Sequence, residues 1–378
     1  MPKVPKVLLS AGMIQGGLSG VGRYVVELAP RLAQFDSIDL HVAGLNADRH
    51  LFSAIDDAHW ISIPAKCAGG LQNLIWHQWS LPGILKKEGF DLLHIPSYRR
   101  IIARSPVPQI ATVHDCAPFR LRDKYGFMRG LFGRQLAPAL ARRCQAILTV
   151  SEFTKRDVVE FYRIPAERIE VIYNGLNHEK YHPQSEDALA AFRKRCSLSN
   201  PFFLYISRLE HPGKNHLPLI EAFERFREKS GQSVDLVLGG ARWHGAEVIE
   251  ARVAGSAYKE SIHLPGFIDE ADLPLWYGAA EALIFPSLME GFGLPVAEAM
   301  ACGSTVMSSD RGSLPEVGGD AALYFSPDSA ASILEAMQAW SAEGPEIRAE
   351  RVRKGGIHVA QFDWDLAAMS TCNRYLKL

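Results

Sequence analysis

The stretch Pro286-Ser-Leu-Met-Glu-Gly-Phe-Gly-Leu-Pro-Val-Ala-Glu298 decides the fold of this chain. It follows an apolar run, typical of a buried strand, that ends at Phe285, and Pro295 is well placed to be the first residue of a helix. Glu290 and Glu298 therefore flank a glycine loop between a strand and a helix. Loop amides and a helix N-terminus can hold a phosphate, and a carboxylate one turn into the helix can accept hydrogen bonds from sugar hydroxyls. The stretch predicts a nucleotide-sugar site.

Composition indicates a soluble α/β protein with reduced thiols. The chain has 378 residues, 47% of them apolar and 22% charged, which is enough for two or three domains with their own cores. The six cysteines are scattered without a Cys-x-x-Cys pair, so neither a zinc knuckle nor a redox motif is indicated. The apolar start runs into Gly16 and Gly17, which favours a buried first strand over a signal peptide.

Charge is unevenly distributed although the net charge is only −1. Residues 1–180 carry 23 Lys and Arg against 16 Asp and Glu, whereas residues 181–378 carry 18 against 26. The excess is concentrated in ten residues that we call the basic segment: Arg99, Arg100, Arg104, Arg120, Arg122, Lys124, Arg129, Arg134, Arg142 and Arg143. No nucleic-acid recognition motif accompanies them. A lipid diphosphate or an anionic leaflet fits the segment better, and ordinary solvated helix faces are the alternative.

Strand-like apolar runs alternate with helical patterns throughout, which is the signature of parallel sheets built from β-α-β units. In the first half the predicted strands are residues 7–11, 40–43, 92–95, 109–113, 146–150 and 170–172, and the predicted helices are 20–34, 127–143 and 152–161. In the second half the predicted strands are 202–206, 235–239, 262–264, 282–285 and 305–308, and the predicted helices are 217–229, 246–254, 269–279, 295–302 and 329–340.

A turn-rich polar stretch, residues 173–185, separates the two series and predicts a linker. We therefore predict an α/β fold of two tandem Rossmann-like, doubly wound domains, residues 1–180 and 181–360, followed by a tail, 361–378. Open α/β sheets bind ligands beyond the carboxyl ends of their strands, so two such domains facing each other across a cleft would both present these ends to a ligand.

The glutamate spacing and the Gly-Phe-Gly-Leu-Pro insert of the opening stretch resemble the E-x7-E signature of retaining family 4 glycosyltransferases. The resemblance covers nearly the whole chain and implies the GT-B fold. It implies an acceptor-binding domain at 1–180, a donor-binding domain at 181–360, and a last helix that returns to the first domain. Two stretches, Trp76-His-Gln-Trp79 and Leu93-His-Ile-Pro-Ser97, look most like bacterial mannosyltransferases of exopolysaccharide and O-antigen pathways.

Two loops of the first domain are candidate site elements. Gly16 and Gly17 form a turn in which amides can approach a phosphate, and the family has a similar loop at the donor diphosphate or the acceptor. The turn is not a dinucleotide fingerprint, which disfavours a dehydrogenase. His114 ends an apolar strand, where the family has a histidine near the donor sugar, and Asp115 could orient its ring. Purely structural roles are the alternative for both loops.

The second domain supplies the other candidates. Arg208 and Lys214 lie on either side of a Pro-Gly turn, with a spacing that resembles the family's pair stabilising the departing diphosphate. Exposed loop cations are the alternative. The resemblance implies that Glu298 holds the ribose hydroxyls and that Glu290 faces the transferred sugar. It also implies that Phe267 and Ile268 cradle the nucleotide base. The amides near the phosphate would belong to Gly291, Phe292, Gly293 and Leu294.

The activity implied by the resemblance is a retaining transfer of a hexose, mannose from GDP-mannose, to a hydroxyl of a lipid-linked saccharide in bacterial polysaccharide synthesis. A UDP-hexose donor and a GT-B sugar-nucleotide epimerase are the alternatives. A two-carboxylate glycosidase is disfavoured because Arg208 and Lys214 would have no purpose at an ordinary glycoside. We expect no cofactor and no metal, since the letters Asp363-Trp-Asp365 precede a helix that Asp365 would cap.

The expected partners are a nucleotide-sugar donor and a saccharide acceptor, linked to a polyprenyl diphosphate, with no nucleic acid. An apolar stripe beside the basic segment would suit the inner leaflet, and a core helix is the alternative; its residues are Leu71, Leu74, Ile75, Trp76 and Trp79. No run reaches the ~18 apolar residues of a membrane span. We expect a cytoplasmic protein that is at most peripheral at the inner face of the plasma membrane.

Overall fold

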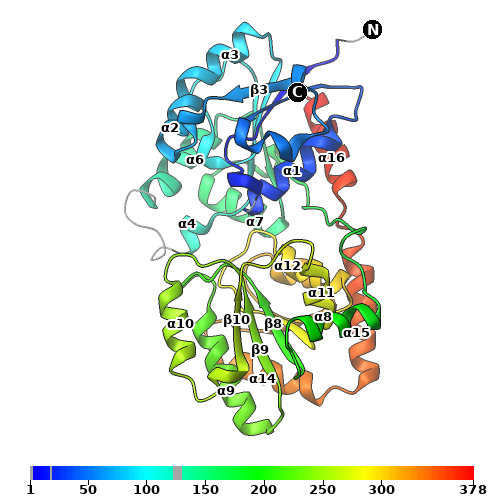
Figure 1. The fold of residues 1–378 in the computed structure, drawn as a ribbon. Helices are drawn as coiled ribbons and strands as arrows, with labels where there is room; N and C mark the ends of the chain where they lie inside the picture. Colours follow the sequence, from blue (N-terminus) through cyan, green and yellow to red (C-terminus); the bar gives the residue numbers. More distant parts are fainter. Residues whose placement is uncertain (1–2, 18, 122–129) are drawn as a thin grey trace. The chain divides into compact units, whose positions relative to one another are not determined.

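The computed structural model describes residues 3–17, 19–121 and 130–378, which form two compact units (Figure 1). Unit 1 comprises Met1–Gly175 and Phe362–Leu378, and unit 2 comprises Leu176–Gln361. Each unit contains one parallel sheet flanked by helices, and this confirms the predicted α/β class with two Rossmann-like domains. The chain changes unit five residues before the predicted boundary at 180.

Unit 1 is built on a seven-stranded parallel sheet of order β3-β2-β1-β4-β5-β6-β7. Its strands are β1 (Lys6–Ser10), β2 (Asp39–Leu45), β3 (Trp60–Ile63), β4 (Leu92–Ile95), β5 (Gln109–Val113), β6 (Ala146–Thr149) and β7 (Ile169–Val171). Its helices are α1 (Gly20–Leu32), α2 (Gly70–Ile75), α3 (Leu81–Lys87), α4 (Ala117–Arg120), α6 (Ala137–Ala141), α7 (Glu152–Asp157) and α16 (Trp364–Leu376). Strand order reverses between β1 and β4, where such sheets bind ligands.

Short 3-10 and π-helical segments lie in the connections of unit 1. The 3-10 turns are η1 (Gln15–Gly17), η2 (Asn46–Phe52), η3 (Asp57–His59), η4 (Ala65–Cys67), η6 (Tyr98–Arg100) and η10 (Ala166–Arg168). The π-helical turns are η5 (Trp76–Ser80), η8 (Phe132–Leu136) and η9 (Val158–Tyr162), each adjoining an α-helix. In the predicted helix 127–143, residues 127–129 lie outside the described residues, as do Arg122, Lys124 and Arg129 of the basic segment.

Unit 2 repeats the pattern with six parallel strands in the order β10-β9-β8-β11-β12-β13. The strands are β8 (Phe202–Ile206), β9 (Asp235–Gly239), β10 (Ile262–Gly266), β11 (Ala282–Phe285), β12 (Thr305–Ser309) and β13 (Leu323–Phe325). The helices are α8 (Glu186–Arg195), α9 (His216–Ser230), α10 (Ala246–Ala254), α11 (Leu273–Ala279), α12 (Leu294–Ala301), α13 (Leu314–Gly318), α14 (Ala330–Ala342) and α15 (Pro345–Val359), with turns η11 (Lys259–Ser261) and η12 (Gly319–Ala321).

Most of the strands that the sequence predicted are buried on both faces, although the predicted edge strands β7 and β10 are only partly buried. Every residue of β5, β9 and β11 is buried, so these strands appear in the sequence as continuous apolar runs. The prediction missed the edge strands β3 and β13, which have four and three residues. Such short strands form because a neighbour offers hydrogen-bonding groups, and their own residues carry little pattern.

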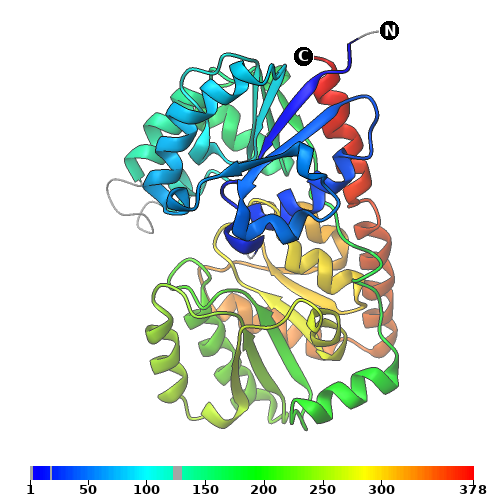
Figure 2. The same cartoon turned by 45° about the horizontal axis from the view of Figure 1, so that its top comes forward.

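The tail packs on unit 1 through α16, which lies against α1 (Figure 2). Phe362 and Trp364 are 1% and 2% exposed and anchor its start. The predicted helix cap was wrong. Asp363 is the N-cap, and its Oδ1 accepts hydrogen bonds from the amides of Asp365 and Leu366 at 2.7 and 2.9 Å. A carboxylate one position before the helix reaches these amides, whereas Asp365 lies inside the first turn.

A buried polar network joins α16 to the centre of the first sheet. One ring nitrogen of His94 lies 2.5 Å from the hydroxyl of Tyr375 on α16, and the other lies 2.8 Å from the hydroxyl of Thr112 on β5. The hydroxyl of Tyr24 on α1 lies 3.2 Å from the same Thr112 hydroxyl. Burial lowers the pKa of His94 to about 3, so the ring is neutral at pH 7.

Replacing His94 should flatten the acid limb of the stability curve. The unfolded imidazole titrates near 6.5 and the folded one near 3, so the unfolded state binds the proton first as pH falls. The free energy of unfolding therefore has its full value, as far as His94 is concerned, above pH 6.5, and it decreases as the pH falls below 6.5. We expect the urea midpoint of His94→Gln to fall less between pH 7 and pH 5 than that of the wild type, and equal slopes would contradict the assignment.

Candidate functional site

The predicted second-domain residues gather at the carboxyl ends of the strands of unit 2. Arg208 and Lys214 follow β8, Phe267 and Ile268 follow β10, and Glu290 follows β11. Strand order reverses between β8 and β11, because the chain first extends the sheet through β9 and β10 and then crosses to the other side of β8. Loops at such a reversal point diverge and leave room for a ligand.

The pair Lys214 and Glu290 forms the centre of this region. Nζ of Lys214 lies 2.6 Å from Oε1 of Glu290, which also accepts a hydrogen bond of 2.6 Å from the hydroxyl of Ser287. Their side chains are only 17% and 18% exposed, so the ion pair is largely desolvated. A charge-assisted bond in such surroundings is stronger than one at the surface, and either charge left alone would be costly.

The loop after β8 places Lys214 through its backbone. The hydroxyl of Tyr205, on β8, donates a 2.7 Å hydrogen bond to the carbonyl oxygen of Lys214. Asn215 adopts a left-handed conformation with φ of 60° just before α9, and its side-chain Nδ2 donates to the carbonyl oxygen of Pro327 at 2.7 Å. The lysine therefore sits on a backbone held from two sides.

The loop that begins at Glu290 is clamped by buried Ser313. The hydroxyl of Ser313 lies 2.7 Å from the carbonyl oxygen of Phe292 and 3.1 Å from that of Glu290. Gly293 has φ of 103°, a conformation open only to glycine at low cost, and α12 begins at the next residue. Gly291, Phe292, Gly293 and Leu294 thus lead directly into the N-terminus of an eight-residue helix, which favours negative charge.

Glu298 lies in the interior of this region. It is 2% exposed on α12, and one of its oxygens accepts a 2.8 Å hydrogen bond from the hydroxyl of Tyr277 on α11. Tyr277 was not predicted as part of the site, because a tyrosine in a helical pattern carries no signal beyond packing. The structure therefore places both glutamates of the opening stretch at one end of the sheet.

Arg208 is held differently from Lys214. Its guanidinium lies 3.1 Å from Oε2 of buried Glu210 and 4.7 Å from the ring centre of Trp243, in a cation–π contact. Trp243 is 52% exposed, which is unusual for so large an apolar side chain. Trp243 and Glu210 were not among the predicted site residues, because an aromatic residue and an acid in polar loops after strands are weak signals.

Phe267 and Ile268 take different positions after β10. Phe267 is 56% exposed, whereas Ile268 is half-buried with its side chain against Gly239 at the end of β9. The amide of Gly240 donates a 2.8 Å hydrogen bond to the carbonyl oxygen of Gly266, which ties the ends of β9 and β10 together. An exposed aromatic ring on a fixed loop is suited to stacking on a flat ligand such as a base.

The first-domain candidates Gly16 and Gly17 form η1, the turn between β1 and α1. Both have positive φ, at 69° and 78°, and the amide of Gly17 donates to the carbonyl oxygen of Ile14 at 2.9 Å. Helix α1 follows with Ser19 as its N-cap, whose hydroxyl accepts from the amide of Gly22. The turn thus lies before a capped helix N-terminus in unit 1.

His114 ends β5 in unit 1, and its ring is oriented by Pro96 rather than by Asp115. Nε2 lies 3.0 Å from the carbonyl oxygen of Pro96, so Nε2 carries the proton and donates it there. Asp115 instead accepts from the amide of Ala117 at the start of α4. The rings of His114 and Tyr24 pack edge to face with 4.9 Å between their centres, and desolvation lowers the pKa of His114 to about 4. The imidazole is therefore neutral at pH 7.

Two family models match the chain in tandem. Residues 18–180 match "Glycosyltransferase Family 4" and residues 187–358 match "Glycosyl transferases group 1". The chain belongs to the glycosyltransferases with the GT-B fold that combine these two domains. The site at the strand ends of unit 2 is thus found in a member of an enzyme family that the sequence resemblance had already indicated.

Similar proteins agree with this assignment. An O-antigen chain mannosyltransferase B of Escherichia coli is 28% identical, covering 98% of this chain and 99% of its own length. An O-antigen chain mannosyltransferase of Salmonella typhimurium is 26% identical, covering 92% and 94%. Among solved structures, a sucrose-phosphate synthase from Thermosynechococcus elongatus aligns with a TM-score of 0.79 at 20% identity, covering 99% and 98%, which shows a shared fold.

A double-mutant cycle on Lys214→Met and Glu290→Gln should reveal strong coupling. Each single change leaves one largely buried charge without its counter-charge, so we expect a loss of about 2 kcal/mol, with the double variant at least about 1 kcal/mol better than additive. Hydrogen exchange of the β11 amides under mild denaturant measures these losses of stability next to the ion pair. The exposed pair Arg353 and Glu350 on α15 is the matched control and should show no measurable coupling. Additive losses for Lys214 and Glu290 would contradict the pairing.

Proposed function

We propose that this glycosyltransferase moves mannose from GDP-mannose to a hydroxyl of a lipid-linked saccharide, with retention of the anomeric configuration. The desolvated pair of Lys214 and Glu290, beside the glycine loop and the N-terminus of α12, is the observation that carries the proposal. Relatives that cover nearly the whole chain are O-antigen mannosyltransferases, which supports mannose as the sugar.

The site chemistry fits a leaving diphosphate. When the bond between the anomeric carbon and the diphosphate oxygen breaks, negative charge grows on that oxygen. Lys214 and the amides of 291–294 can stabilise the charge without reorganising, because their backbone is already fixed. The acceptor oxygen bonds to the anomeric carbon on the same face, and its proton passes to the departing phosphate. In this proposal the positive potential comes from the protein, and no metal is needed.

The remaining candidates receive roles from the family resemblance. Glu298 would accept hydrogen bonds from the ribose hydroxyls, and Phe267 would stack on the base. His114 would help to hold the donor sugar, and its neutral ring would not repel positive charge at the anomeric carbon. Arg208 would contribute further positive charge near the phosphates, with Trp243 supporting its guanidinium.

Slow hydrolysis of GDP-mannose tests both the donor and the stereochemistry without an identified acceptor. Water replaces the acceptor, and proton NMR follows the first-formed mannose before it mutarotates. We expect the α anomer, and a rate reduced about 10²- to 10³-fold in Lys214→Ala because one stabilising cation is lost. Lys354→Ala on α15 is the matched control and should leave the rate unchanged. First-formed β-mannose, an unchanged rate in Lys214→Ala, or conversion to an isomeric nucleotide sugar would overturn the proposal.

The lipid-linked acceptor is proposed from an exposed apolar stripe on unit 1. Leu71, Ile75 and Trp79, four residues apart along α2 and η5, are 67%, 49% and 80% exposed. Trp76, which the sequence grouped with them, is buried in the core, and Leu74 is half-buried. Three exposed large apolar side chains on one helix face are typical of a surface that meets a membrane or another apolar partner.

The stripe lies beside part of the basic segment. Arg100 donates to the carbonyl oxygen of Gly70, at the start of α2, at 3.0 Å, and Gln78 on η5 donates to that of Ile101 at 3.0 Å. Not every cation of the basic segment is available to an anionic partner, because Arg120 forms an ion pair with Asp157 at 2.6 Å. Within the described residues, no helix has both the length and the apolar character to cross a bilayer.

Co-sedimentation with liposomes tests the membrane surface. The triple variant Leu71→Ser, Ile75→Ser, Trp79→Ser should lower the partition of the protein into the vesicle pellet about tenfold or more, since it removes the exposed apolar side chains of the stripe. Vesicles with anionic lipid at low salt are the probe. The double variant Ile347→Ser, Ile357→Ser, at exposed positions of α15, is the control. Equal partition of the triple variant and the wild type would contradict a role of the stripe in membrane binding.

A further inference from the structure

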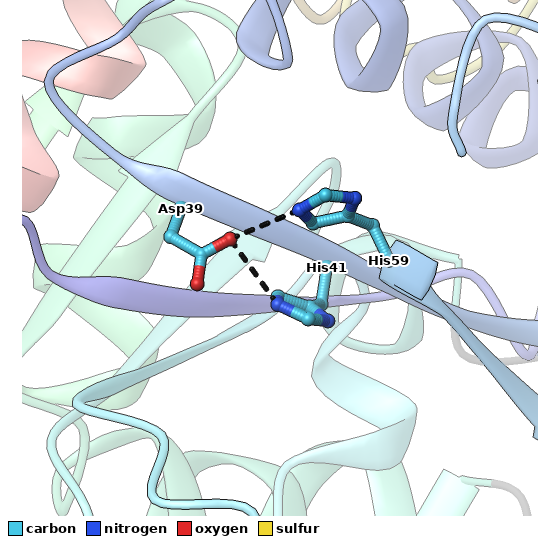
Figure 3. A group of neighbouring side chains, drawn as sticks. All are labelled: Asp39, His41 and His59. Atoms are coloured by element: carbon cyan, nitrogen blue, oxygen red, sulfur yellow. Dashed lines mark ion pairs between the residues drawn. The ribbon is translucent and has the colours of Figure 1, made fainter. Parts of the chain in front are cut away.

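Three potential metal ligands converge where β2 and β3 begin, at one edge of the sheet of unit 1. They are Asp39 and His41 on β2 and His59, the last residue of η3, and one donor atom from each lies within 4.8 Å of the others (Figure 3). Among the described residues no other group of three or more His, Cys, Asp or Glu side chains meets this condition.

The strand register explains the convergence. Asp39 and His41 are two apart on β2, so their side chains point to the same face of the sheet. Strands β2 and β3 pair in parallel with Val42 opposite Trp60, which brings His59 alongside His41 where both strands begin. The imidazole rings lie 4.7 Å apart between centroids. Their positions follow from backbone pairing, so the group does not depend on a flexible loop.

The separations suit a bound ion better than simple hydrogen bonds. Nε2 of His41 and Nε2 of His59 lie 3.2 and 3.3 Å from the same Oδ1 of Asp39. Ordinary N–H···O bonds reach about 3.2 Å at most, and both contacts are at or beyond that limit. Two ligands bound to tetrahedral zinc at about 2.05 Å lie about 3.3 Å apart. The two distances from Asp39 therefore match the edge length of a zinc coordination shell, and all three donor atoms lie within 4.8 Å of one another.

The surroundings of the three ligands bury one of them and leave the other two accessible to solvent. The side chain of His41 is the least exposed of the three, at 11%. Its ring packs edge-on against Phe90 at 5.2 Å, while the side chains of Asp39 and His59 are 39% and 40% exposed and leave a path for an ion. The ammonium of Lys6 lies over the ring of Phe90, at 4.8 Å from its centre.

We propose that Asp39, His41 and His59 bind one divalent transition-metal ion, with zinc the best match to two imidazoles and a carboxylate. Three protein ligands leave a fourth position for water. The site lies where β2 and β3 begin, whereas Gly16, Gly17 and His114 follow the ends of their strands. The ion is thus structural: it links the residue before edge strand β3 to β2 and so holds together the two ends of the segment that connects these strands. The inference is independent of the proposed transfer reaction.

Cobalt titration of the full-length protein is the test, because Co²⁺ replaces zinc and its visible absorption reports the ligands. After EDTA treatment and dialysis, we expect one equivalent of Co²⁺ to give a visible band that Zn²⁺ removes, and Zn²⁺ to raise the Tm by at least about 2 °C. His59→Gln should lower Co²⁺ affinity at least about tenfold and abolish the Tm shift. The matched control is His50→Gln, which removes an exposed histidine of η2 and should change neither.

Asp39→Asn provides a second variant with little change of shape, so a folding defect in one variant does not decide the outcome. Loss of the band in both variants, with His50→Gln unaffected, supports the site. Absence of any band or Tm shift at millimolar metal overturns it. A band that persists in His59→Gln and Asp39→Asn, or one with strong thiolate-to-cobalt absorption, also overturns it by placing the ion at another group such as half-buried Cys196.

Discussion

The contact on which the account of this site depends is the ion pair between Lys214 and Glu290, 2.6 Å long and largely withdrawn from water. The two residues are 76 positions apart and meet because β8 and β11 are neighbours in the sheet. A cation and an anion in such a place cost free energy to desolvate, and a hydrophobic pair of similar volume would usually serve stability as well or better. Their presence at a strand-order reversal is better explained by chemistry than by stability.

The rest of unit 2 holds this pair in position. Tyr205 and Asn215 fix the backbone of the lysine loop, and Ser313 fixes the backbone of the glutamate loop. The ends of β8, β9, β10 and β11 are all buried or hydrogen-bonded to one another, so the loops leave a rigid base. Preorganised groups of this kind stabilise developing charge without moving, which is the main requirement for transfer from a diphosphate.

Local sequence predicted the parts of the fold and site that local chemistry determines. The central strands, the helix after the glycine loop and the candidates Lys214 and Glu290 all lie in short recognisable stretches. What the sequence could not show depends on residues far apart in the chain. The contact of Trp243 with Arg208, the edge strands β3 and β13, and the convergence of His59 on β2 each require knowing which strands are neighbours. The helix cap was also predicted wrongly, because the helix begins two residues earlier than expected and Asp363, not Asp365, is its N-cap.

The central claim is that the strand ends of unit 2 bind a nucleoside diphosphate sugar, and a thermal-shift panel tests it most directly. GDP-mannose, UDP-glucose, UDP-galactose and UDP-N-acetylglucosamine would each be added in EDTA to the wild type and to Glu298→Gln. A donor at 100 times its dissociation constant adds about 2.7 kcal/mol to the stability of the state that binds it. We expect stabilisation by GDP-mannose that is strongly reduced in Glu298→Gln. Absence of stabilisation by any donor, or equal stabilisation of both proteins, would contradict it.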